Sequence, residues 1–103
     1  MSEERPKGIA SVQIDNDRLR VTLWSFAPGA ATGFHRHAHD YCVVPLVTGR
    51  LRIEEGGRRS EAGLTAGQPY YREAGVEHDV INANPFDFAF VEIELKEPRV
   101  RER

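Results

Sequence analysis

The chain has 103 residues, of which 40% are hydrophobic, and this suits one domain with a single modest core. Lysine and arginine number 14 against 16 aspartate and glutamate, and the net charge of -2 argues against a dedicated nucleic-acid binder. One cysteine cannot form an internal disulfide, and no apolar run approaches the roughly 18 residues of a membrane span. Residues 1–8 are too charged for a signal peptide, so we expect a cytoplasmic protein without nucleic-acid or membrane partners.

Short alternating runs separated by turn residues predict an all-β domain. Leu19, Val21 and Leu23 alternate with polar residues, which is the period of a half-buried strand. A run rich in β-branched residues covers 41–47, and Gly56-Gly57 is typical of a hairpin turn. Further strands are expected at Leu51 and Ile53, at Val80 and Ile81, and from Ala89 to Leu95. Many short strands at this spacing predict a sandwich or barrel.

The chain shows no internal domain boundary, no repeat of fixed period and no low-complexity segment. Turn residues are frequent between 63 and 75 and leave little room for a helix there. We therefore expect one β-barrel domain at 9–96, between a flexible N-terminal tail at 1–8 and a charged C-terminal tail at 97–103.

The last expected strand has two faces of different chemistry. Phe86, Phe88 and Phe90 share one parity, opposite an aliphatic stripe within 89–95. We expect the aromatic residues to face outward. Because such a face is costly to leave in water, it predicts a homodimer interface.

The four histidines of the chain lie in two places. His35, His37 and His39 fall within five residues, whereas His78 lies far along the chain. Imidazole is the commonest metal ligand among side chains, and residues spaced i, i+2 on a strand point to the same face. The pattern predicts a metal site formed by His35 and His37, with His78 arriving from a second strand.

The surroundings of the first histidines resemble the first motif of the cupin family. The match consists of Gly29, five residues, His35-Arg36-His37, four residues, Cys42, six residues and Gly49. The family usually has glutamate where this chain has Cys42.

The surroundings of His78 resemble the second cupin motif. Here the match is Gly67, five residues, Glu73-Ala74-Gly75, two residues, His78, three residues and Asn82, with Glu73 where proline is usual. Two motifs in this order form a more specific signal than either alone. More loosely, His-Arg-His and several neighbouring segments are similar to a subgroup of small cupins associated with β-alanine degradation; these segments are Asp40-Tyr41, 43–46 and 75–78.

This resemblance implies a jelly-roll β-barrel with a divalent metal inside one end. The family's ligands are the two histidines of the first motif, the glutamate, and the histidine of the second motif. His35, His37 and His78 match three of these positions, and Cys42 replaces the fourth. The implied centre is therefore a three-histidine site.

Three interpretations of Cys42 compete. It could bind the metal as a thiolate, which would favour softer ions such as zinc or copper. It could lie beside the metal without binding it, an arrangement similar to that of some thiol dioxygenases of the cupin superfamily. It could also pack as a small buried hydrophobe. We place the second interpretation first and direct ligation last.

Two further residues near the first motif, His39 and Asp40, also have alternative roles. His39 shares the parity of His37 and could be a fourth ligand or a proton relay, although a histidine at the solvent-exposed rim is the simpler interpretation. Asp40 has the opposite parity, which makes it a poor ligand unless the chain turns there.

Other residues could line the pocket. Trp24 and Phe34 could form an apolar wall, although a place in the barrel core is the simpler role for each. Arg72, if it faces inward, could bind a carboxylate substrate, although a solvated side chain is the simpler expectation. Arg58 and Arg59 are typical of a solvated turn.

The three-histidine site divides the possible functions into two classes. The first is a mononuclear non-haem metal enzyme, dioxygenase-like or metal-assisted, that acts on a small polar metabolite; Fe(II) is the expected ion, with Zn, Mn and Ni as alternatives. The second is a non-catalytic cupin that binds a metal or senses a small molecule. Fold alone does not separate them, and we favour the oxidoreductase. A purely structural domain would not need the histidines.

Overall fold

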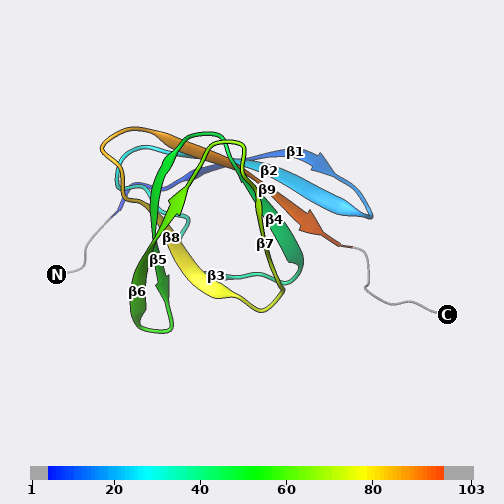
Figure 1. The fold of residues 1–103 in the computed structure, drawn as a ribbon. Coiled ribbons are helices and arrows are strands. Elements are labelled where there is room, and N and C mark those ends of the chain that lie inside the picture. The colour runs from blue at the N-terminus through cyan, green and yellow to red at the C-terminus, as the bar shows by residue number, and fades with distance from the viewer. Residues whose placement is uncertain (1–4, 97–103) are drawn as a thin grey trace.

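The structure is a computed structural model that describes residues 5–96, and the described part contains strands and no helix (Figure 1). This confirms the predicted all-β, jelly-roll barrel. Residues 1–4 and the whole of the predicted tail at 97–103 lie outside the described residues. The strands are β1 (Ile9–Asp15), β2 (Leu19–Phe26), β3 (His35–Arg36), β4 (Asp40–Pro45), β5 (Gly49–Glu55), β6 (Arg58–Leu64), β7 (Tyr70–Arg72), β8 (Glu77–Asn82) and β9 (Phe88–Leu95).

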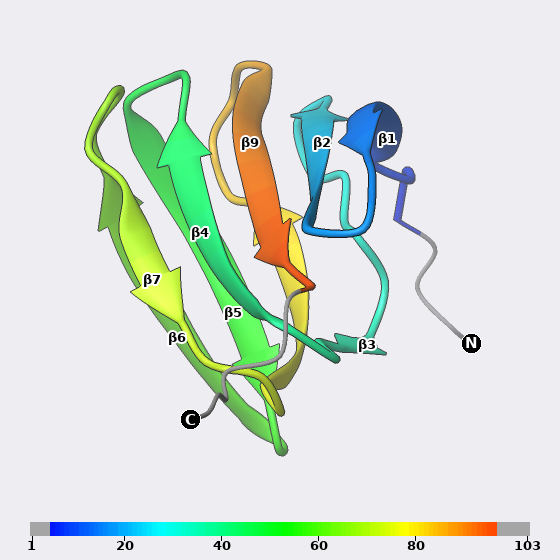
Figure 2. The ribbon, with the colours of Figure 1, turned by 90° about the vertical axis from the view of Figure 1, so that its right-hand side faces the viewer.

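Two antiparallel sheets enclose the core. The larger sheet has the order β1-β2-β9-β4-β7, and the smaller has the order β3-β8-β5-β6. Figure 2 shows the larger sheet in front, with β9 between β2 and β4, and the β5–β6 hairpin behind it. The order places strands from both ends of the chain side by side. As a result, residues of β3, β4, β8 and β9 can meet inside one barrel.

The turn between β5 and β6 follows from its two glycines. Gly56 and Gly57 have φ angles of 57° and 79°, the left-handed region that a tight hairpin requires at both central residues. The register then pairs Glu55 with Arg58 directly across the turn. The hairpin predicted at this glycine pair is confirmed.

The inner face of the larger sheet is aromatic. Phe88 is 1% exposed and packs in the core with Phe26, Phe90 and Tyr41. The prediction that the aromatic parity of β9 faces outward is therefore wrong for Phe88 and Phe90, whereas Phe86, before the strand, is exposed. Alternation shows that the two faces differ but not which one is inside. The barrel interior takes the bulkier side chains because close packing requires that they fill it.

The aliphatic residues of β9, such as Val91 and Ile93, point to the outer face of the larger sheet. The strand register aligns one apolar row across all of its strands, and the row consists of Ile14, Val21, Ile93, Cys42 and Tyr71. Cys42 is half-buried in this row. The sole cysteine of the chain therefore belongs to the outer surface of the sheet.

The described part of the N-terminal segment is joined to the barrel. The Gly8 amide donates a hydrogen bond to the Ala31 carbonyl at 2.8 Å, and the Ala31 amide donates to the Pro6 carbonyl at 3.0 Å. Residues 6–8 of the predicted tail thus pair with the loop that leads to β3. Among residues 5–96, no helix is long and apolar enough to span a membrane.

Candidate metal centre

Two adjacent strands bring the three histidines together. His35 on β3 lies directly opposite His78 on β8 in the strand register. His37 follows β3, and its amide donates a hydrogen bond to the Val76 carbonyl at 2.8 Å, while its carbonyl accepts one from the Gly75 amide at 2.8 Å. Backbone pairing therefore sets all three side chains at one end of the barrel. This is the arrangement that the sequence predicts.

Each of the three imidazole rings directs its Nε2 atom toward the centre of the cluster. The Nε2 atom of His37 lies 3.0 Å from Nε2 of His35 and 3.2 Å from Nε2 of His78. If two nitrogens bind one ion by bonds of about 2.1 Å, they lie about 3.0 Å apart at a right angle and about 3.4 Å apart at a tetrahedral angle. The observed spacings fit a single transition-metal ion.

A hydrogen bond sets the tautomer of His35. Its Nδ1 donates to the Gly33 carbonyl at 2.7 Å, so the proton is on Nδ1 and the Nε2 lone pair faces the cluster. Metal-binding histidines commonly donate their other N–H in this way, because the bond orients the ring and raises its basicity. The second coordination shell of His35 is therefore already formed.

Burial keeps the other two rings neutral. His37 and His78 are 4% and 5% exposed. Burial, followed by the charge of His35, lowers the pKa of His37 to about 4 and the pKa of His78 to about 3. Both rings therefore carry a free lone pair at neutral pH, which a metal ligand needs. The buried Nδ1 of His78 has no hydrogen-bond partner among the described residues.

Tyr41 holds the ring of His37 from one side. The two rings stack with centroids 3.8 Å apart and planes inclined by 16°. Burial raises the pKa of Tyr41, and its hydroxyl has no hydrogen-bond partner in the described part of the chain. Buried polar atoms are normally paired, so the unpaired hydroxyl of Tyr41 and Nδ1 of His78 mark this end of the barrel as one that can accept a polar ligand or water.

A small cavity lies beside the histidines. Its volume is about 20 Å³, room for about one water molecule. His35, His78 and Tyr41 line it together with Trp24, Tyr70 and Glu92. Trp24 is thus a wall of the cavity, as one interpretation of the sequence predicts.

Glu92 is a site residue that sequence reasoning missed. It lies on β9 with the inward parity of Phe88 and Phe90, and its Oε2 is 3.9 Å from Nε2 of His37. Burial and then the charge of Glu94 raise the pKa of Glu92 to about 7, while a hydrogen bond from Trp24 opposes the rise. Correct assignment of the inner face of β9 would have identified this residue.

Cys42 and His39, the two additional candidates, do not join the cluster. Tyr41 and Val43 line the cavity, so Cys42 between them points to the opposite face of β4. His39 lies in the bend before β4 and outside the group of histidines that could hold an ion. Of the three interpretations of Cys42, packing as a small apolar side chain fits the structure.

Asp40 forms hydrogen bonds that support the fold and does not join the histidine cluster. Its Oδ2 accepts a hydrogen bond from the Tyr71 hydroxyl at 2.7 Å, and its Oδ1 accepts one from the Ala74 amide at 2.9 Å. These bonds join the start of β4 to the loop after β7. Its parity, opposite to that of Tyr41, directs it away from the histidines, in agreement with the sequence.

Arg72 faces the cavity end of the barrel. It shares the parity of Tyr70, which lines the cavity, and lies opposite Tyr41 in the strand register. The charge of Arg72 helps to lower the pKa of both His37 and His78. Its guanidinium lies 3.9 Å from the Glu55 carboxylate, which is a long distance for an ion pair, and both side chains are accessible to solvent. This ion pair is therefore weak.

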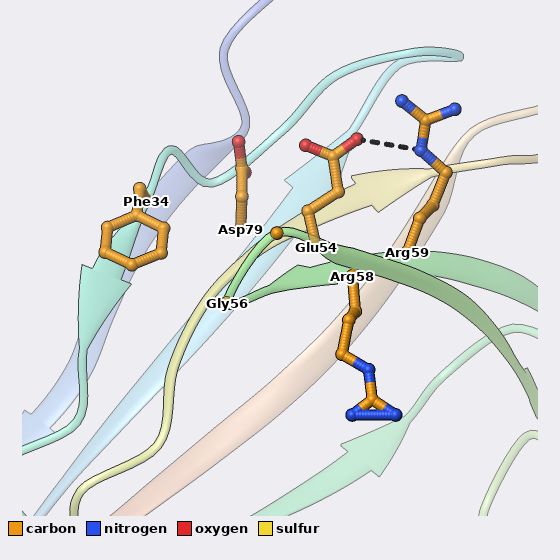
Figure 3. Close-up of a pocket in the computed structure, with 7 residues that line it drawn as sticks. Phe34, Glu54, Gly56, Arg58, Arg59 and Asp79 are labelled. Carbon is orange, nitrogen blue, oxygen red and sulfur yellow. Dashed lines mark ion pairs between the residues drawn. The ribbon is translucent and has the colours of Figure 1, made fainter.

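A larger hollow of about 340 Å³ lies on the outside of the smaller sheet, and Phe34 lines it (Figure 3). The Glu54 carboxylate, which lines it, pairs with Arg59 of the same hollow at 3.4 Å and with Arg5 at 3.2 Å. Figure 3 shows the Arg58 side chain directed away from this pair. Phe34 is 66% exposed and does not line the histidine cavity, so this hollow is separate from the candidate metal centre.

Comparison with known proteins identifies a family model and a curated relative. Residues 22–94 match the model described as "Cupin domain". Over 92 residues the chain is 54% identical to the beta-alanine degradation protein BauB of Pseudomonas aeruginosa, and the match covers 89% of this chain and 97% of BauB.

Solved structures give the same result. A cupin domain from Bordetella pertussis Tohama I is 50% identical, with a TM-score of 0.90, and the match covers 93% of this chain and 100% of that one. The TT1209 protein of Thermus thermophilus is 24% identical with a TM-score of 0.71, and the match covers 89% of this chain and 86% of that one. The second likeness concerns the fold alone.

Proposed function

The chain belongs to the cupin family, and from this premise we propose that it is a metal-dependent enzyme whose His35, His37 and His78 bind one divalent transition-metal ion. The observation that carries the proposal is the convergence of the three Nε2 atoms at spacings of 3.0 Å and 3.2 Å. Hydrogen bonding alone would explain this convergence poorly, because Nε2 of His37 has two nitrogen neighbours but only a single lone pair or a single proton.

The ion would supply Lewis acidity, and Fe(II), the ion we favour, would add redox chemistry with dioxygen. The chain's own residues prepare the site for it. The His35–Gly33 hydrogen bond orients one ring, and the Tyr41 stack orients another. The surrounding core side chains restrict access of water, which strengthens the electrostatic interactions of the site.

We propose that the substrate is a small metabolite with a carboxylate group. Arg72 is the cation on the cavity side of β7, and its weak pairing with Glu55 leaves the guanidinium able to bind a carboxylate. BauB carries a name that refers to β-alanine degradation, and β-alanine is itself a small carboxylate. A cavity of about 20 Å³ beside the histidines admits only a small reacting group.

The metal proposal is tested by elemental analysis of untagged protein purified without chelators. We expect about one transition-metal ion per chain, with iron after anaerobic reconstitution, and its loss in His37→Ala. His39→Ala is the matched control, because His39 lies outside the cluster. A wild-type protein that binds no metal after reconstitution would contradict the proposal and favour a cupin that binds small molecules without an ion.

The enzymatic part is tested by oxygen uptake with the iron-loaded protein and a panel of small carboxylic acids. We expect turnover with at least one acid and a raised KM in Arg72→Gln, because the lost guanidinium acts on binding. The control Arg50→Gln changes an exposed arginine that pairs with Glu61 on the hairpin. No uptake with any acid, together with retained metal, would contradict the oxygenase and favour the sensor.

We also propose that two copies of the chain pair through the outer face of the larger sheet. All seven residues of the edge strand β1 are exposed, and the apolar row through Ile93 includes the exposed side chains of Ile14 and Tyr71. A second copy would bury both, since an open edge strand and an apolar face favour association. Light scattering should show a dimer that Ile93→Asp converts to a monomer with its metal retained. A monomeric wild-type protein would contradict this.

A further inference from the structure

Glu92 is an inward carboxylate at the histidine cluster. Its side chain is only 12% exposed, and it lines the cavity that His35 and His78 also line. Within residues 5–96, no lysine or arginine lies at ion-pair distance from it, and the nearest basic nitrogen is Nε2 of His37 at 3.9 Å. A buried carboxylate is costly unless a cation or several hydrogen bonds compensate it.

The register explains why the carboxylate comes from β9. The first cupin motif places a glutamate at the position of Cys42, but Cys42 faces the outer side of the sheet. On the neighbouring strand, Glu92 lies directly opposite Val43, which is one residue from Cys42 and faces the cavity. The inner surface at this height of the barrel therefore has a carboxylate, on the strand beside the one where the motif would place it.

The distance of Glu92 from His37 is below the upper limit for two ligands of one ion. Two atoms bound to one ion by bonds of about 2.1 Å are at most about 4.2 Å apart, when they lie on opposite sides. The 3.9 Å between Oε2 and Nε2 of His37 is within this limit. The carboxylate lies on the His37 side of the cluster and is not in reach of all three rings at once.

We propose that Glu92 is the fourth protein ligand of the metal centre and that an entering ion draws its carboxylate toward the three histidines. This inference rests on the proposed function, because it assumes that the histidines bind an ion. A three-histidine, one-carboxylate set has one more hard oxygen donor than histidines alone, which favours iron or manganese over soft ions. Cys42 then has no part in metal binding.

The test is titration of the metal-free protein with Co(II), with affinity measured against a competing chelator and the coordination recorded by visible absorption. The variants are Glu92→Gln and, as control, Glu94→Gln. Glu94 shares the strand and the parity of Glu92, but it pairs with Arg20 at 3.6 Å. Because the amide oxygen of Gln is a weaker ligand than a carboxylate, we expect Glu92→Gln to weaken Co(II) binding by about 100-fold, the upper end of the range for outer-shell residues, and to change the absorption bands. Glu92→Asp should restore part of both, and Glu94→Gln should have a smaller effect on affinity and leave the absorption bands unchanged.

The outcomes separate this inference from the proposed function. If Glu92→Gln binds Co(II) with the affinity and spectrum of the wild type while His37→Ala loses it, the Glu92 assignment is overturned and the three-histidine site stands. If Glu94→Gln has the larger effect, the ion lies among His37, Glu92 and Glu94, a group that also comes within 4.8 Å, and the four-ligand site is overturned. If the wild type itself binds no Co(II), both proposals fail.

Discussion

The two ends of the barrel treat buried polar groups in opposite ways. At the end of β8, the Asn82 amide nitrogen donates to the carbonyls of Phe26, Ala27 and Phe86, and its Oδ1 accepts from the backbone and side-chain nitrogens of Asn84. Near the start of the same strand, the buried Nδ1 of His78 has no partner, and neither has the nearby hydroxyl of Tyr41, among the residues described.

This difference separates the buried polar groups that support the fold from those that surround the candidate metal centre. A fully paired network stabilises one backbone arrangement, because loss of any member leaves the others unpaired. A cluster of lone pairs beside a carboxylate without a cation adds little to stability, and it gains its partner when an ion binds. The asparagine end should therefore control stability, and the histidine end should control metal affinity.

Replacement of a histidine should have the largest effect on binding. His37→Ala removes the ring whose Nε2 lies between the other two, and we expect metal affinity to fall by more than about 100-fold, beyond the range for outer-shell residues. The stabilisation by metal, about 4 kcal/mol at an ion concentration 1,000 times Kd, should disappear with it. Thermal unfolding with and without metal measures this. Equal metal-induced shifts in His37→Ala and His39→Ala would contradict the division between the ends.

Replacement of the asparagine should have the largest effect on stability. Asn82→Ala leaves three carbonyls and two Asn84 nitrogens without this partner, and we expect a loss of about 4 kcal/mol in the free energy of unfolding. Urea unfolding of the metal-free protein measures the loss. At low temperature, where the variant is folded, its metal affinity should equal that of the wild type. A large loss of affinity would show that the two ends are coupled.

Glu92 provides a further test of the difference between the two ends, because its buried carboxylate should lower the stability of the metal-free protein above neutral pH. Its pKa is raised from 4.5 to about 7, so the folded state holds this proton more tightly than the unfolded chain. Its contribution to stability is complete below pH 4.5 and is lost as the pH rises through 7, by up to about 3 kcal/mol. Metal-free Glu92→Gln should therefore be more stable than the wild type at about pH 8.5 and nearly equal to it at about pH 5. Urea unfolding at both values checks this, and a pH-independent difference would refute it.

Replacement of the cysteine should have the smallest effect. Cys42 is half-buried on the outer face, so Cys42→Ser exchanges a thiol for a hydroxyl in partial contact with solvent. We expect a stability loss below about 1 kcal/mol and an unchanged metal affinity. The Co(II) titration provides the readout, and weaker binding in this variant would return Cys42 to the metal centre.

Much of the fold and most of the candidate site could be predicted from local pattern. The Gly56-Gly57 pair predicts the hairpin because two consecutive left-handed residues match its twist. His35 and His37 predict a shared direction because they are two residues apart near β3. The histidine pattern predicts His78 as the third member, the resemblance of the second motif supports this, and the register places His78 opposite His35.

The sequence by itself determined the class of the fold, the positions of the main strands and the three histidines that meet, since turn chemistry and alternation act over a few residues. Only the tertiary structure decided which face of each strand is inside. Phe90, predicted to face outward, is in the core, Cys42 lies on the outer surface, and Glu92 enters the cavity. The physical reason is that alternation with a period of two is symmetric between the faces of a strand, and packing of two sheets against each other removes that symmetry.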